Sequence, residues 1–244
     1  MVYDECSTRE LSRVLIILGT IVTLSITPVT TIAKADSVNP GIYSRDSRPF
    51  GLSYGDWINR WWQWNMEIPS GEHPRLHYIP SRCGINQSGP VWFLSHLLTG
   101  KEERTCTIPS GKAILVPMLT GNCDADFTTP NAPASESDPN LIDCAKAGNE
   151  YGAISATLDG RKLQDLDKYR TLTGFFNLTV PKDNVYQNRP GTWRAINDGF
   201  FVFLEPLPPG KHDLHLTTNV INPVDSSYNY AADLIYHLMI KPKT

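Results

Sequence analysis

Between residues 53 and 68, apolar side chains recur with the period of an α-helix. At about 100° per residue, three tryptophans fall within one narrow arc: Trp57, Trp61 and Trp64. Ser53 is a suitable N-cap, Asp56 can complete a capping box with it, and Pro69 ends the pattern. The stretch therefore predicts one amphipathic helix with an unusually aromatic face.

The rest of the chain is typical of short strands rich in β-branched and aromatic residues. Eight such runs stand out: 91–98, 105–108, 113–119, 153–158, 172–180, 200–204, 214–218 and 230–240. Alternation around His215 places Leu214 and Leu216 inward, whereas residues 200–204 are apolar on both faces, as in a central strand covered by the helix. Residues 36–50 and 181–198 are expected to be extended loops.

These elements predict a mainly β protein. Without helical patterns between the strands, we expect antiparallel sheets folded into a β-sandwich, of the jelly-roll or immunoglobulin-like kind, with the tryptophan-rich helix packed on it. The length of 244 residues and the 41% hydrophobic content suit a globular chain rather than a disordered one. A formal net charge of −3 gives no basic surface, so nucleic acid is not an expected partner.

The N-terminal region is typical of a targeting segment. Residues 14–33 carry no charge, and the small residues Ala33 and Ala35 around Lys34 fit a signal-peptidase site. We therefore expect residues 1–35 to be a signal peptide and residues 36–244 to be one secreted, extracellular domain. The alternative is an uncleaved anchor on the outer face of the membrane, which would contact the bilayer only through residues 14–33.

In an exported chain, cysteines are expected to form disulfide bonds. Beyond Cys6 there are four, and an even number in an oxidising compartment predicts two disulfide bonds. Of the three pairings that four cysteines allow, we favour Cys83 with Cys106 and Cys123 with Cys144, because each closes a loop of about twenty residues.

One face of the helix is a candidate ligand site. Trp57, Trp61 and Trp64 are expected to be core residues, but Trp62 lies toward the edge of the apolar arc. An exposed indole there could stack against a sugar ring. Its polar neighbours would complete the site: Arg60, Gln63 and Glu67.

The acidic segment between Cys123 and Cys144 is a candidate for weak calcium binding. Its oxygen ligands would include four aspartates: Asp124, Asp126, Asp138 and Asp143. The spacing differs from that of an EF-hand, and a solvated acidic loop is the simpler interpretation. No other cofactor is expected.

Three segments together resemble a family of exported microbial proteins without an established activity. They follow the patterns WxxRWWQW at 57–64, CGxxQSGPVWFL at 83–94 and DGFFVFLEPLPPGKH at 198–212. The resemblance covers roughly residues 50–240. It implies an exported β-rich domain, but it transfers no functional residue.

Two classes of function remain open. The chain lacks G-x-S-x-G, H-E-x-x-H and P-loop motifs, which favours a noncatalytic module that binds a glycan, a cell-envelope component or a protein. The alternative is a secreted hydrolase with a glycosidase-like carboxylate pair. Asp56 and Glu67 would stand about 16 Å apart along the helix, too far for that chemistry, whereas Glu67 with Glu205 is not excluded by spacing.

Overall fold

The computed structural model describes residues 39, 41–96, 99–125 and 139–243, which lie within a unit spanning Asp36–Thr244. The expected targeting segment 1–35 lies outside the described residues. Among the described helices, none is long and apolar enough to cross a membrane.

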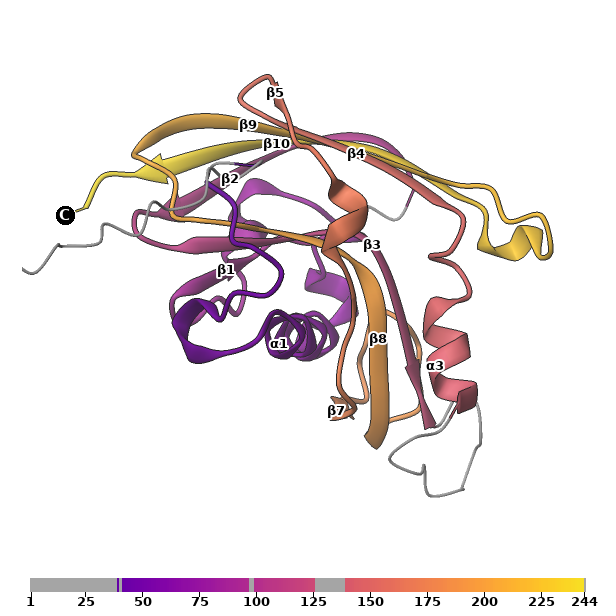
Figure 1. Cartoon of the computed structure of the whole chain (residues 1–244). Coiled ribbons are helices and arrows are strands. Elements are labelled where there is room, and N and C mark those ends of the chain that lie inside the picture. The colour runs from indigo at the N-terminus through magenta and orange to yellow at the C-terminus, as the bar shows by residue number, and fades with distance from the viewer. Residues whose placement is uncertain (1–38, 40, 97–98, 126–138, 244) are drawn as a thin grey trace, which may run out of the picture. The chain divides into compact units, whose positions relative to one another are not determined.

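The described strands form two five-stranded sheets (Figure 1). One sheet has the order β2 (Gly100–Pro109), β10 (Tyr230–Lys241), β9 (Gly210–Val220), β4 (Gly152–Leu158) and β5 (Arg161–Lys162). The other has the order β1 (Val91–Phe93), β3 (Ala113–Asp124), β8 (Gly191–Leu204) and β6 (Arg170–Leu172), and β7 (Phe176–Val180) also pairs with β8. The β-sandwich prediction is confirmed.

The apolar side chains form a core on each face of the second sheet. Facing the first sheet, Val202 of β8 packs with Leu216 of β9 and Leu238 of β10. On the opposite face, Phe201 and Phe203 of β8 pack against α1. Strand β8 is thus apolar on both sides because it lies between two layers.

Helix α1 (Tyr54–Glu67) has the predicted boundaries and cap. The Ser53 side chain accepts a hydrogen bond from the Asp56 backbone, and the Asp56 side chain accepts one from the Ser53 backbone, which completes the capping box. Three tryptophans lie in the core against the second sheet, as expected: Trp57, Trp61 and Trp64. The remaining described helical segments are α3 (Pro139–Lys146) and the short 3₁₀ turns η1 (Pro49–Gly51), η2 (Ser70–Glu72), η3 (Pro80–Gly84), η4 (Leu166–Tyr169) and η5 (Ser226–Tyr228).

Both predicted disulfide bonds are present. Cys83 in η3 is bonded to Cys106 in β2, and Cys123 in β3 is bonded to Cys144 in α3. Two disulfides indicate an oxidising environment for this part of the chain.

Three expectations about secondary structure need correction. The sheets are mixed rather than wholly antiparallel, because β1 pairs with β3, and β2 with β10, in parallel. The helix α3 was not expected. Residues 191–198 belong to β8 rather than to a loop, since their buried polar side chains have partners: Asn197 accepts from Asn122 at 2.6 Å, and Asp198 pairs with Arg170 at 2.8 Å.

Candidate functional site

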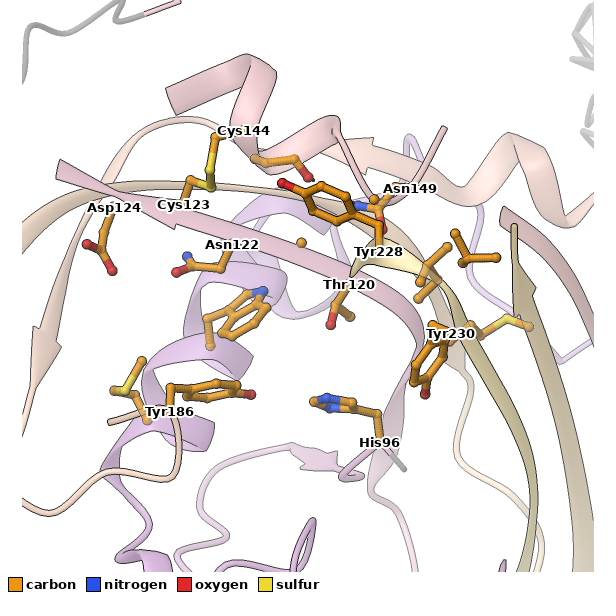
Figure 2. A pocket seen from close by; sticks show the side chains of 18 of the residues that line it. His96, Thr120, Asn122, Cys123, Asp124, Cys144, Asn149, Tyr186, Tyr228 and Tyr230 are labelled. Carbon is orange, nitrogen blue, oxygen red and sulfur yellow. Dashed lines mark hydrogen bonds between the residues drawn. A yellow bond between two sulfur atoms is a disulfide. The ribbon is translucent and has the colours of Figure 1, made fainter. Parts of the chain in front are cut away.

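A cavity of about 400 Å³ opens beside the second half of β3, and we call it the β3 pocket. Its walls come from α1, β3, α3, the turns around them and the adjacent ends of β9 and β10. Its lining includes Trp62, Arg75, Gly121 and Asn188. Figure 2 labels further lining residues: His96, Thr120, Asn122, Cys123, Asp124, Cys144, Asn149, Tyr186, Tyr228 and Tyr230.

The sequence builds this pocket by changing the character of β3 halfway along. A register shift between Pro117 and Leu119 interrupts the pairing with β8, and the strand then continues with more polar residues to Asp124. Gly121 lets α3 approach closely, because a Cβ atom there would lie 2.2 Å from the carbonyl oxygen of Ala145. The Cys123–Cys144 bond holds the two elements together at this point.

Aromatic rings form much of the pocket wall. The indole of Trp62 and the ring of Tyr186 lie 5.7 Å apart between centroids. The guanidinium of Arg75 lies 4.9 Å from the centre of the Tyr186 ring, in cation–π geometry. Tyr228 and Tyr230 line the pocket as well. Such flat apolar faces are suited to stacking against a ligand ring.

Two histidines stand beside Arg75, and burial keeps both neutral. Burial lowers the pKa of His73 to about 4; its Nδ1 accepts a hydrogen bond from the Arg75 backbone at 3.1 Å, and its Nε2 donates to the Asn65 carbonyl at 2.9 Å. Burial, together with the charge of Arg75, also lowers the pKa of His96 well below its usual value. His96 and Tyr186 point toward one another on the side of the pocket away from the disulfide (Figure 2).

A buried arginine fixes the segment that carries His96. Arg104 donates from Nη1 to the carbonyl oxygens of Ser95 and His96, at 3.3 and 3.4 Å, and to the hydroxyl of Tyr236 at 3.1 Å. Its Nη2 pairs with Glu102 at 2.9 Å. These bonds anchor the His96 backbone although no strand contains it.

The disulfide side of the pocket carries amides and a carboxylate. Asn122 donates its amide hydrogen to Asn197 at 2.6 Å, and Asn149 donates to the Asp198 carbonyl at 2.7 Å. The Asp124 carboxylate is buried and accepts from Asn188 at 3.3 Å. Because Asn149 uses its amide hydrogens inside the protein, it offers a ligand its oxygen.

Three buried polar atoms of the pocket residues have no hydrogen-bond partner. They are Trp62 Nε1, Arg75 Nε and His96 Nδ1, three of the seven such side-chain atoms in the described part of the chain. A buried polar group without a partner costs roughly 1–3 kcal/mol. Their concentration around one cavity marks it as the candidate binding site.

The structure brings one of the four residues expected to bind a ligand into this site. Trp62 lines the β3 pocket, but it is only 5% exposed, so the expectation of an exposed platform is wrong. It packs beside Tyr186, which comes from a distant segment, with the two rings tilted by 44°.

The other three lie on α1 outside the residues that line the pocket. Arg60 stacks over Trp57 at 5.1 Å. Gln63 exchanges two hydrogen bonds with the Thr179 backbone, at 3.0 and 2.9 Å, and also donates to Glu67 at 3.0 Å. In this structure Gln63 therefore joins α1 to β7.

The four aspartates expected to bind calcium are only partly described. Asp124 lines the β3 pocket, and Asp143 is exposed on α3. Asp126 and Asp138 lie outside the described residues. Where the chain is described, no group of three or more His, Cys, Asp or Glu side chains could hold a metal ion.

No family model matches the chain, and no curated protein matches it. One solved structure, titled the structure of PbICP-C in complex with falcipain-2, aligns with 63% of this chain and 100% of its own. The sequence identity is 10% and the TM-score is 0.23, a similarity that carries no argument about fold or function.

Proposed function

We propose that the protein is an exported, noncatalytic binding module and that the β3 pocket holds one unit of a glycan. The observation that carries the proposal is the aromatic lining of the pocket, together with the buried polar atoms of three lining residues that lack a hydrogen-bond partner. A sugar ring has apolar faces that stack on aromatic rings and hydroxyls that both donate and accept hydrogen bonds. The pocket offers both kinds of contact.

Binding is favoured over hydrolysis by the carboxylates. Glycoside hydrolysis generally uses two carboxyl groups about 5–9.5 Å apart. Among the described residues, Asp124 is the one carboxylate on the pocket wall. The two disulfides support export, because such bonds form in oxidising compartments.

Two tyrosines provide a matched test of this proposal. Tyr228 lines the pocket and Tyr151 does not, yet each is 39% exposed. The purified protein is screened on a glycan array, and hits are measured by titration calorimetry. Tyr228→Ala is expected to weaken binding about tenfold, equivalent to a stacking contribution of about 1.4 kcal/mol, while Tyr151→Ala leaves it unchanged.

Two results would overturn the proposal: the absence of any glycan bound by the wild-type protein, or equal losses of affinity in the two variants. Release of free sugar from a bound oligosaccharide would replace it with the hydrolase alternative.

A further inference from the structure

We propose that the glycan unit bound by the β3 pocket is an acidic sugar, and that its carboxylate pairs with the guanidinium of Arg75. This inference rests on the proposed function, because it assigns the ligand class of the same pocket.

The Arg75 side chain is half-buried, and within the described residues no carboxylate forms an ion pair with it. Its side chain lies over the ring of Tyr186 and also hydrogen-bonds to the hydroxyl of that residue. A partly desolvated cation without an anion is costly, and an incoming carboxylate would recover that cost.

The positive charge of Arg75 acts on other residues that line the pocket. Burial is the largest influence on the pKa of His96, Tyr186 and Tyr230, and in each of them the charge of Arg75 acts in addition, lowering the pKa. All three residues line the β3 pocket. Arg75 is therefore the positive group of this side of the cavity.

The hydrogen-bonding groups around Arg75 are mostly donors. Trp62 Nε1 and Arg75 Nε can only donate, and both lack a partner. The Tyr186 oxygen already accepts a hydrogen bond from Asn65 at 2.5 Å, so its own hydrogen remains to be donated. Neutral His96 adds one N–H donor and one acceptor nitrogen. A cluster of donors around a guanidinium is suited to an oxyanion.

The charge balance selects a carboxylate over a phosphate. Arg75 supplies one positive charge to this side of the pocket, and Arg104 is already paired with Glu102. A monoanion would neutralise Arg75, whereas a phosphate dianion would leave excess negative charge beside it.

Asp124 and Asn149 then set the orientation of the sugar. The Asp124 carboxylate repels a second anion and accepts hydrogen bonds from hydroxyls. The oxygen of Asn149 is also available to hydroxyls on the disulfide side. We therefore expect the sugar carboxylate to face Arg75 and its hydroxyls to face Asp124.

The experiment compares sugars that differ in the group at C6, which is a carboxylate, a methyl ester or a hydroxymethyl group. Binding of glucuronate and galacturonate to the wild-type protein is measured by titration calorimetry against glucose, galactose, the methyl esters of the two uronates, and inorganic phosphate. We expect each uronate to bind at least tenfold more tightly than its methyl ester and its neutral parent sugar, and phosphate not to compete.

Two arginine variants test whether Arg75 is the group that pairs with the sugar carboxylate. Arg75→Gln is expected to remove the difference in affinity between each uronate and its methyl ester, so that the two ligands bind within about twofold of one another. Arg161→Gln, at an exposed arginine of β5 outside the pocket, is the matched control and should retain the preference. If Arg75→Gln does not fold, Arg75→Lys and the comparison of acid with ester in the wild-type protein still decide the question.

The outcomes separate the two proposals. Equal binding of neutral sugar and uronate overturns the acidic-sugar inference and leaves the glycan module intact. Retained preference in a folded Arg75→Gln protein overturns the role of Arg75. Competition by phosphate at uronate affinity overturns the selection of a carboxylate. If none of these sugars binds while benzoate does, both the glycan module and the acidic-sugar inference fail.

Discussion

Two neighbouring tryptophans of α1 provide a sharp test of the hydrogen-bonding argument. Trp61 and Trp62 are both buried, and their rings lie 5.2 Å apart. The indole N–H of Trp61 donates to the Leu94 carbonyl at 2.8 Å, whereas that of Trp62 has no partner. Replacing either tryptophan with phenylalanine removes a similar part of the ring. The change at Trp61 also removes a hydrogen bond, whereas the change at Trp62 removes an N–H that has no partner.

The expected free energies of unfolding follow from this difference. In Trp61→Phe, the Leu94 carbonyl loses its donor, which costs about 1–3 kcal/mol, and the missing ring volume costs on the order of 1 kcal/mol more. The total loss is about 2–4 kcal/mol. Trp62→Phe loses a similar ring volume but removes a buried donor without a partner, so its stability should stay unchanged or rise by up to about 2 kcal/mol.

Urea unfolding followed by circular dichroism measures both values. An unchanged slope with a shifted midpoint would show that only stability changes. If Trp62→Phe loses as much stability as Trp61→Phe, the Trp62 N–H is bonded in the free protein. The β3 pocket would then have one donor fewer to offer a ligand.

Two further predictions concern the walls of the pocket, and a third concerns His73 beside Arg75. Gly121→Ala should lower stability by about 1–3 kcal/mol in urea unfolding, because its Cβ would lie 2.2 Å from the Ala145 oxygen; unchanged stability would show that α3 is not held there. Replacing Cys123 and Cys144 together by alanine should cost about 3 kcal/mol under non-reducing conditions, as estimated from the 21-residue separation, and a loss below 1 kcal/mol would contradict the loop-entropy argument. Burial lowers the pKa of His73 from 6.5 to about 4 in the folded protein. Its contribution to stability is therefore complete above pH 6.5 and is lost as the pH falls from 6.5 through about 4. His73→Gln should flatten that part of a profile of unfolding free energy against pH.

Local signals predicted the parts of the fold that depend on neighbours in sequence. The capping box and the periodicity of the tryptophans placed α1 within a residue of its boundaries. Loop length selected the correct pairing of the cysteines, since each bond joins neighbours along the chain. The two-sided apolar run at 200–204 predicted the helix-covered central strand.

Features that depend on distant contacts were not predictable in the same way. The direction of β2 beside β10 is set by packing between segments far apart in sequence, so alternation alone could not distinguish parallel from antiparallel pairing. Residues 191–198 contain Asn197 and Asp198, which a hydrophobic pattern assigns to a loop. Both are buried because other strands supply their partners.

Of the residues predicted to bind a ligand or calcium, Trp62 and Asp124 are the described ones that line the β3 pocket. Arg75, His96 and Tyr186 come from separate segments, and no spacing rule connects them. The one available signal was the change from apolar to polar character in β3, which marks the place where the strand leaves the core. A pocket assembled from many segments appears only when tertiary structure brings them together.

The position of β10 has a consequence for biosynthesis. This strand lies between β9 and β2, and among the described strands β2 pairs with β10 alone. During synthesis, β2 is complete long before residues 230–241 are made. Until then it cannot form its backbone hydrogen bonds with β10. Both cysteines of the Cys83–Cys106 disulfide are synthesised before β10, so this bond can hold β2 in place until β10 is made. Polypeptides truncated before residue 230 should therefore acquire this crosslink yet remain sensitive to proteases.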